Sequence, residues 1–254
     1  MLEVTILAIL QGVAEFLPIS SSGHLVIAQH LLGVNEAGMR LDVFLHLGTL
    51  VSILFFYARP IARILVDRQW IYMGKILLST LPALLVYFVF GDFIASLFEN
   101  ARMVGALLMF TGAMLLGTRY IPCGSRDVSI LRALFMGIGQ AVALLPGVSR
   151  SGMTLVFARG GKVEPEKAAE FSFLMSAPLI VGAAGMELIK CLKGDSAVSS
   201  AAETSWSLTI YGTIVAAIVG YWSLKLLLKS LKGRWFWLFG PYCIVAGLLA
   251  LIFC

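Results

Sequence analysis

Apolar residues run through this chain in long stretches, without the alternating or striped patterns of a soluble core. Six of these stretches approach the roughly 20 residues that a helix needs to cross a bilayer. They cover residues 41–59, 73–91, 103–119, 170–190, 206–226 and 235–254. The pattern predicts an all-α integral membrane protein with six transmembrane helices.

Two further apolar regions are interrupted by short polar breaks. Residues 2–16 are followed by such a break and the short apolar piece 23–33, and residues 129–145 by another break and the piece 151–158. Neither second piece is long enough to cross the bilayer after its partner. We therefore predict two re-entrant helix-loop-helix pairs, each of which enters and leaves the membrane on one side.

The two interrupted regions repeat one another at a distance of 129 residues. Gln11 corresponds to Gln140, and the run Ser20-Ser21-Ser22-Gly23 corresponds to Ser149-Arg150-Ser151-Gly152. Because an odd number of predicted crossings separates the copies, the second must insert from the opposite face. The sequence thus predicts one membrane domain, 1–254, built as an inverted-topology repeat with repeat one at 1–120 and repeat two at 129–254.

Composition and charge agree with a bilayer environment and set the orientation. Hydrophobic residues make up 59% of the chain, charged residues 13%, and the formal net charge is +5. On the predicted topology, fourteen Lys and Arg residues gather on one side and four on the other. The rich side is expected to be cytoplasmic, with both termini outside. The positive charge is thereby explained by membrane topology, so no nucleic-acid partner is expected. Residues 193–205 are the expected flexible outer loop.

The first break places polar groups at membrane depth. Gln11 and Glu15 are four residues apart, so they share one helix face. An ionised carboxylate there needs a metal, Arg150 or a water-filled cavity as partner, and the alternative is a Glu15 that caps the helix or snorkels to the interface. After Pro18, hydroxyls and helix N-terminal N–H groups occur together, which suits phosphate oxygens, although ordinary helix capping and a structural His24 are open alternatives. The residues of this half-site are Gln11, Glu15, Ser20, Ser21, Ser22 and His24.

The second break supplies a guanidinium. Arg150 cannot lose its charge, its planar fork suits phosphate, and a structural role between apolar runs is hard to justify. Ser149 and Ser151 flank it, and Thr154 lies one turn further along. If the two loops meet, their sum is a phosphate pocket with an acid, a base and a candidate nucleophile. For two other polar residues, Asp42 and His46 at the start of the first crossing, packing or interface roles are favoured over lining the entrance of the site.

The two motifs together resemble the signatures of the undecaprenyl-pyrophosphate phosphatase family of the bacitracin-resistance type. The resemblance rests on residues 11–24, 146–154 and 169–174 and extends over essentially the whole chain. Gln11 stands where the family has Glu or Gln, so a mechanism that needs two glutamates on that helix is in doubt. Met153 replaces a commoner small residue, and Arg159 lies in a run that is usually apolar, for which the sequence offers no account.

The resemblance implies an enzyme of the bacterial inner membrane that hydrolyses undecaprenyl diphosphate to undecaprenyl phosphate and phosphate. This would recycle the lipid carrier for peptidoglycan synthesis and confer bacitracin resistance. It also implies a divalent metal, Mg²⁺ or Ca²⁺, and a site that faces the periplasm or exterior. Carried over by motif, Glu15 would bind metal or handle protons, Ser21 and His24 would take part in the chemistry, and Arg150 would hold the diphosphate.

Two questions stay open at this point. The nucleophile is either Ser21, activated by His24, or a metal-bound water. The main rival function is a transporter or flippase of a phosphorylated polyprenyl lipid, since inverted repeats with broken helices also build transporters. A scaffold without chemistry would leave Glu15 and Arg150 unexplained. The sequence leaves the oligomeric state open.

Overall fold

The computed structural model describes residues 1–32, 39–98, 100–193 and 205–254, and these residues are helical almost throughout. Within them the only β interaction is an isolated bridge between Arg126 and Val163. The predicted all-α class is confirmed for this part of the chain, whereas most of the expected outer loop, 194–204, lies outside it. The helices are α1 Leu2–Ala14, α2 Ser21–Leu32, α3 Met39–Phe56, α4 Ala58–Val66, α5 Trp70–Phe98, α6 Ala101–Gly117, η1 Thr118–Tyr120, α7 Ile130–Val142, α8 Arg150–Gly160, α9 Pro165–Lys193, α10 Trp206–Lys232, η2 Phe236–Leu238 and α11 Phe239–Phe253.

Four predicted crossings appear as helices long and apolar enough to span a membrane. In the described residues these are Trp70–Phe98, Ala101–Tyr120, Trp206–Lys232 and Phe236–Phe253. Their outer faces carry large exposed apolar side chains, among them Phe88 at 79% and Leu85 at 66% exposure on α5. Apolar surface of this extent belongs in lipid. The chain is a multi-pass membrane protein.

Of the other two predicted crossings, one differs from expectation and one forms the expected helix. The segment 41–59 does not continue as one helix, because Leu41–Phe56 and Ala58–Val66 meet at a 69° bend. Pro60 lacks the N–H that would bond the Phe56 carbonyl, so α3 cannot run through it, whereas the first turn of α4 tolerates a proline. The segment 170–190 does form a helix, within α9, although the candidate spans found among the described residues do not include it.

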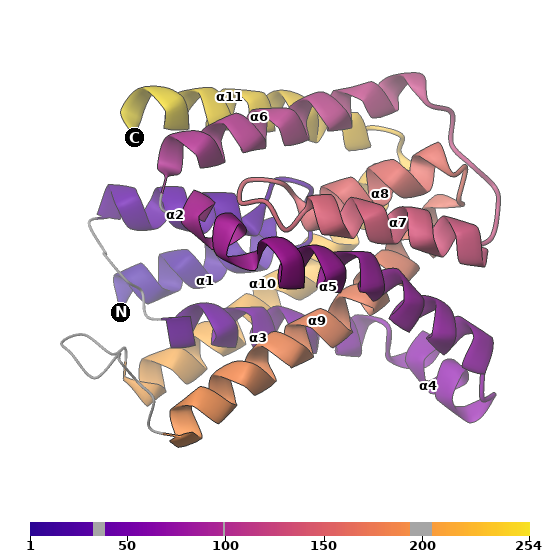
Figure 1. Ribbon diagram of the computed structural model, residues 1–254, viewed down its shortest axis with the longest axis horizontal. Coiled ribbons are helices and arrows are strands. Elements are labelled where there is room, and N and C mark those ends of the chain that lie inside the picture. Colours follow the sequence, from indigo (N-terminus) through magenta and orange to yellow (C-terminus); the bar gives the residue numbers. More distant parts are fainter. Residues whose placement is uncertain (33–38, 99, 194–204) are drawn as a thin grey trace.

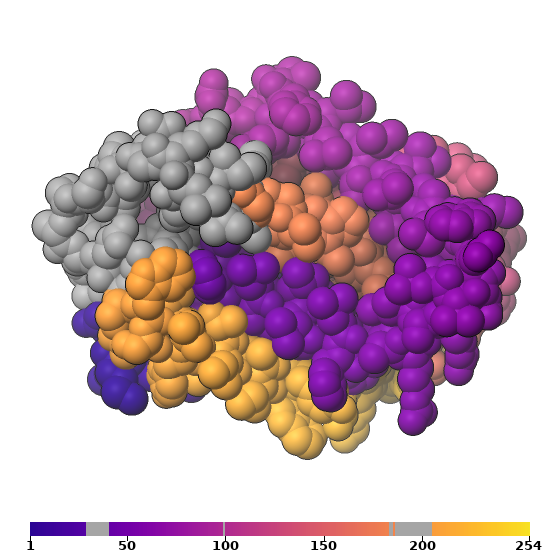
Figure 2. Space-filling model, turned by 90° about the horizontal axis from the view of Figure 1, so that it is seen from below, coloured from indigo at the N-terminus to yellow at the C-terminus, as the bar shows by residue number. Residues whose placement is uncertain are grey.

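The helices of the two halves pair across the molecule (Figure 1). α1 packs on α10 in the second half and α7 packs on α5 in the first, while α6 and α11 lie side by side. α3 contacts α10 in the same way that α9 contacts α5, and the view from below shows α9 between α3 and α5 (Figure 2). Each half thus completes the packing of the other, which brings the two interrupted regions to the middle of the molecule.

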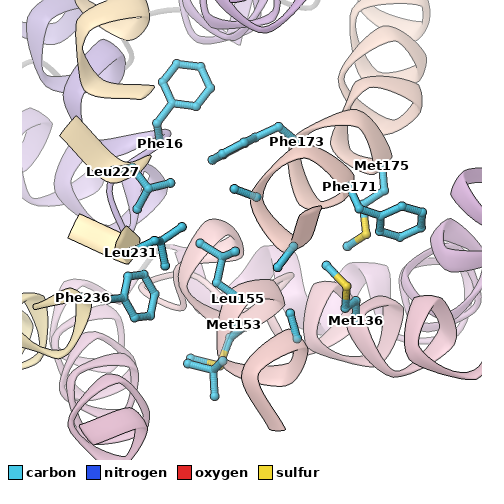
Figure 3. Close-up of a cluster of buried hydrophobic side chains, with 14 of the residues drawn as sticks. Phe16, Met136, Met153, Leu155, Phe171, Phe173, Met175, Leu227, Leu231 and Phe236 are labelled. Atoms are coloured by element: carbon cyan, nitrogen blue, oxygen red, sulfur yellow. The ribbon is translucent and has the colours of Figure 1, made fainter. Parts of the chain in front are cut away.

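A core of aromatic and aliphatic side chains joins the halves beneath the two loops (Figure 3). Phe16, directly after α1, meets Phe173 of α9 edge to face, with ring centroids 5.4 Å apart. Leu227 of α10 belongs to the same cluster and is fully buried. Edge-to-face pairs of this kind add about 0.5–1.5 kcal/mol to the gain from burial. The loop after α1 is therefore fixed by packing on helices of the second half.

Glycines form a close seam between α6 and α11. A β-carbon built on Gly112 would lie 2.6 Å from the Gly240 carbonyl oxygen, and one built on Gly240 would lie 2.8 Å from the Gly112 carbonyl oxygen. Gly105 and Gly247 face one another in the same reciprocal way. Small residues allow this approach of backbones, as at many helix interfaces in membranes.

Gly112→Leu is expected to lower the free energy of unfolding by about 1–3 kcal/mol, because the added side chain meets backbone that cannot move aside. The measurement is thermal unfolding in detergent. Gly74→Leu on α5 is the matched control, since a β-carbon at Gly74 meets nothing within 4 Å. Equal melting temperatures for the two variants would contradict the seam.

Candidate active site

The first loop begins where α1 ends at Ala14. Glu15 follows directly, and Pro18 lies in the turn that leads to α2. Ser20 adopts a left-handed backbone conformation, φ 69°, and its hydroxyl accepts a hydrogen bond from the Gly23 N–H at 3.2 Å. Ser20 therefore caps α2, as the capping alternative expects, while the next hydroxyl, that of Ser21, turns toward Glu15.

The second loop is held against α6. Gly147 has φ 88°, and a β-carbon there would lie 2.3 Å from the Val104 carbonyl oxygen, so only glycine fits. Thr111 of α6 donates its hydroxyl to the Gly147 carbonyl at 3.0 Å and accepts the Ser149 N–H at 3.1 Å. Sequence analysis missed this anchoring role of Thr111, because a threonine inside an apolar span gives no sign of its partner. The Ser149 hydroxyl caps α8 by accepting the Gly152 N–H at 3.1 Å.

The two loops touch each other. The Ser151 hydroxyl donates to the Leu17 carbonyl at 3.2 Å, which is a direct hydrogen bond between the halves. A β-carbon at Gly23 would lie 3.0 Å from the Gly147 α-carbon, and one at Gly152 would lie 3.3 Å from Pro18. The expectation that the loops meet is confirmed by these contacts.

Glu15 is the centre of the polar cluster. The Arg150 guanidinium donates to its Oε1. Its Oε2 accepts the Ser21 hydroxyl at 2.7 Å and the Gln11 amide at 3.0 Å. The Glu15 side chain is only 3% exposed, whereas that of Arg150 is 22% exposed. A buried, fully paired carboxylate rules out a Glu15 that snorkels to the interface, and its partner is the arginine of the other half.

A pocket of about 440 Å³ opens beside this cluster. Its polar lining comes from both loops and from the first turns of α3. The polar residues are Glu15, Ser20, Ser21, Ser22, Asp42, His46, Ser149 and Arg150. For Asp42 and His46 the structure therefore supports the less favoured alternative, because both line the pocket. Their spacing of four residues at the start of α3 is the signal that places them on one face.

Three predicted site residues, His24, Ser151 and Thr154, are not among the residues that line the pocket. The His24 ring has Nδ1 2.8 Å from the Ser20 carbonyl oxygen and Nε2 2.8 Å from the Tyr242 hydroxyl, and it stacks on the Tyr242 ring. The Thr154 hydroxyl lies 2.5 Å from that of Ser172. The Ser151 hydroxyl donates to the Leu17 carbonyl. These three side chains therefore hold the loops in place through hydrogen bonds to neighbouring residues.

A divalent cation remains a prediction for this site. Among the described residues, no group of three or more His, Cys, Asp or Glu side chains could hold a metal ion by itself. The site does offer hard oxygen donors, namely the Glu15 carboxylate and the buried side-chain oxygen of Gln11, which has no hydrogen-bond partner. Mg²⁺ often takes one or two carboxylates and completes its shell with water and substrate phosphates. The donors therefore fit a cation whose shell a phosphorylated ligand completes.

Arg159, which the sequence left without an account, has a structural role away from the site. Its Nε donates to the Ile121 carbonyl at 2.7 Å and so ties the loop after η1 to α8. Met153 is fully buried in the core, in agreement with tolerated packing.

Comparison with known proteins identifies the family. A family model described as "Bacitracin resistance protein BacA" matches residues 4–249. A protein of Halothermothrix orenii named "Undecaprenyl-diphosphatase" is 37% identical over 98% of this chain and 96% of its own length. Proteins of Desulforapulum autotrophicum, "Undecaprenyl-diphosphatase", and Bacillus cereus, "Undecaprenyl-diphosphatase 3", are each 35% identical over 97% and 99% of this chain and 96% of their own lengths. With the family model matching nearly the whole chain and relatives alike from end to end, the chain belongs to the bacitracin resistance protein BacA family.

Proposed function

We propose that this chain is an undecaprenyl-diphosphatase that hydrolyses undecaprenyl diphosphate to undecaprenyl phosphate and phosphate in the bacterial plasma membrane. The observation that carries the proposal is the Glu15, Ser21 and Arg150 cluster, in which a base, a hydroxyl and a phosphate-binding cation from two halves meet at one pocket. A site that only binds a phosphorylated lipid needs a cation such as Arg150, but it does not need a serine hydroxyl hydrogen-bonded to a carboxylate. The combination favours chemistry over transport.

Arg150 is assigned to the diphosphate. A guanidinium has five N–H donors, so it can stay hydrogen-bonded to Glu15 and still donate hydrogen bonds to phosphate oxygens. Ser22 and the N-terminal N–H groups of α2 and α8 flank the same pocket and suit an anion. Phosphoryl transfer depends chiefly on positioning and charge stabilisation, and these groups supply both.

Ser21 is the favoured nucleophile, with Glu15 rather than His24 as its base. The Ser21 hydroxyl already donates to the Glu15 carboxylate, whereas both His24 ring nitrogens face other partners. In this mechanism the Ser21 oxygen attacks the terminal phosphorus, the bond to the bridging oxygen breaks, and undecaprenyl phosphate leaves as Glu15 accepts the hydroxyl proton. Water then hydrolyses the phosphoserine. Direct attack by water, with Glu15 as its base, is the alternative.

Gln11 and Glu15 would hold the divalent cation, Mg²⁺ or Ca²⁺. When bound, it would supply charge neutralisation to the diphosphate in addition to Arg150. The other proposed phosphate-binding residues, Ser20, Ser149, Ser151 and Thr154, act in this account by fixing the loops.

A phosphoserine at Ser21 is the expected signature of this mechanism. Brief exposure of purified protein to lipid diphosphate labelled in its terminal phosphate, followed by acid quench, should leave label at Ser21 that mass spectrometry locates. The Ser21→Ala variant should carry no label. It should also lose activity severely, because the proposed nucleophile is absent. Absence of label at Ser21, under conditions in which the protein releases phosphate, would assign the attack to water.

We also propose a membrane topology for the chain. Six crossings and two re-entrant pairs form repeats at 1–120 and 129–254 of opposite orientation, with both termini and the site on the outer face. The exchanged pairing of α1 with α10 and α7 with α5 supports two equivalent halves. The unequal distribution of Lys and Arg supports the orientation.

Phosphate release in detergent tests the function. A detergent solution has no two compartments, so a transporter produces no signal there, whereas a phosphatase releases one phosphate per lipid. The purified chain should release phosphate from undecaprenyl diphosphate, EDTA should suppress the release, and Mg²⁺ or Ca²⁺ should restore it. A monodisperse protein that releases none would favour the transporter.

A further inference from the structure

We infer that a basic groove at the C-terminal end of α10 binds the head group of an anionic phospholipid from the surrounding membrane. The groove has a volume of about 580 Å³ and lies where the end of α3 meets α10. Its lining includes Phe56, Lys225, Lys229, Lys232 and Trp235. None of these residues lines the pocket beside Glu15, so the groove is a second site that does not depend on the proposed function.

The first support is the arrangement of three lysines. Lys225, Lys229 and Lys232 follow one another at spacings of four and three residues, so they lie along one face of α10. All three side chains are exposed. The described lining of the groove contains no carboxylate, although Glu166 lies 2.9 Å from the ammonium of Lys232. The groove therefore carries a net positive charge that a phosphate group complements.

The second support is the unused hydrogen-bonding capacity of these lysines. The ammonium of Lys225 lies 4.6 Å from the ring centroid of Tyr221 and 4.4 Å from that of Trp222. Ring faces hold this ammonium in place but accept no ordinary hydrogen bond. Within the part of the chain that the structure describes, Lys229 has neither an ion pair nor a hydrogen bond from its side chain. Two ammonium groups thus retain donors for phosphate oxygens.

The third support is the position of the groove along the membrane span. The span Trp206–Lys232 has 27 residues, which is about 40 Å of helix. The hydrocarbon core of a bilayer is only about 30 Å thick, so the last turns of α10 extend into the head-group layer. Trp235 fits this depth, because tryptophan is enriched at membrane interfaces.

Apolar surface for the acyl chains adjoins the groove. Trp222 and Leu226 on α10 are 63% and 43% exposed, and Phe55 at the end of α3 is 78% exposed. Each of these residues lies within one turn of a residue that lines the groove. A phospholipid whose chains cover this surface would place its phosphate at the lysines. A soluble phosphate compound would leave the apolar surface unused, which favours a lipid as the occupant.

Lysines at the end of a helix also stabilise the helix dipole and set the membrane orientation. Neither effect depends on which lipid surrounds the protein. A head-group site differs, because basic groups between membrane helices select anionic lipids. Selectivity between an anionic and a zwitterionic phospholipid with the same acyl chains therefore distinguishes the inference from these two roles.

The test is native mass spectrometry of the detergent-purified full chain with equal amounts of dioleoyl phosphatidylglycerol and dioleoyl phosphatidylcholine. We expect the unsubstituted chain to retain phosphatidylglycerol preferentially. Lys229→Gln should weaken this binding about fivefold, and Lys225→Gln combined with Lys229→Gln about twenty-fivefold, as expected for the loss of one basic group at a time from a lipid surface. Glutamine keeps most of the length of lysine, and an exposed position tolerates the change.

The matched control is Lys162→Gln. Lys162 is an exposed lysine at the same end of the molecule, since its neighbour Val163 lines a small cavity together with Leu231 of α10. It does not line the groove, so this variant should retain phosphatidylglycerol as the unsubstituted chain does. A loss in Lys162→Gln equal to that in Lys229→Gln would show a general effect of charge and would overturn the inference.

Equal retention of the two lipids overturns the inference, and so does a preference for phosphatidylglycerol that the groove variants leave unchanged. Thermal unfolding with inorganic phosphate covers the remaining ligand. If phosphate alone raises the melting temperature through Lys229 while phosphatidylglycerol is not retained, the groove binds a soluble anion and the lipid assignment is wrong. The readout is lipid retention, so a chain that releases no phosphate from undecaprenyl diphosphate still tests this inference.

Discussion

Arg150→Ala is expected to lower kcat/KM for phosphate release by a factor of about a thousand or more. Arginines that stabilise a phosphoryl group in transfer contribute about 10³–10⁵ in rate. Among the described residues that line the pocket, Arg150 is the arginine, and its side chain is partly exposed. The measurement is initial phosphate release from undecaprenyl diphosphate in detergent, over a range of lipid concentrations.

Stability has to be separated from activity in this variant. Removal of Arg150 leaves Glu15 buried without its cationic partner. Breaking a buried ion pair in this way lowers the free energy of unfolding by about 3–5 kcal/mol. Arg150→Lys is the informative companion, because it keeps the charge but loses the planar fork and should recover only part of the rate. A monodisperse Arg150→Ala protein that kept more than a tenth of the activity would show that the assigned role is wrong.

Glu15→Gln is expected to lower kcat by a factor of about a hundred to ten thousand, the range of general base catalysis. The substitution preserves shape but replaces one of the two accepting oxygens with an NH2 donor, and it removes the charge that receives the Ser21 proton. It also removes the ionic partner of Arg150. The KM should change less than kcat, because the phosphate-binding groups remain.

The matched control is Glu3→Gln, an exposed carboxylate in the first turn of the same helix. It should leave phosphate release unchanged. Should Glu15→Gln turn over at more than a tenth of the unsubstituted rate while folded, Glu15 would not be the base, and its role would be to position Arg150.

The local breaks in the chain were predictable, because proline and glycine act through their own backbone. Pro18 and Gly147 mark the two loops, and the helices on either side begin and end within a few residues of the expected positions. The meeting of the loops was also predictable from the repeat. The bend at Pro60 follows from the same backbone rule, but the apolar run around it concealed the break.

The face that each side chain presents was not predictable. Thr154 shares α8 with Arg150, yet its hydroxyl bonds Ser172 of α9 and does not line the pocket. His46 appeared to be a packing residue, because only the docking of α3 beside Glu15 reveals what its ring meets. Spacing along a helix gives relative directions, whereas the neighbour in each direction depends on tertiary packing.

The central claim is that Glu15 and Arg150, from different halves of the chain, act as one site. The most direct test is a double-mutant cycle in phosphate release with Glu15→Gln, Arg150→Gln and the double variant. If the residues act as a unit, the double variant will lose little more than the more severe single variant. Losses that multiply would show that the two residues contribute independently, and would contradict a composite site.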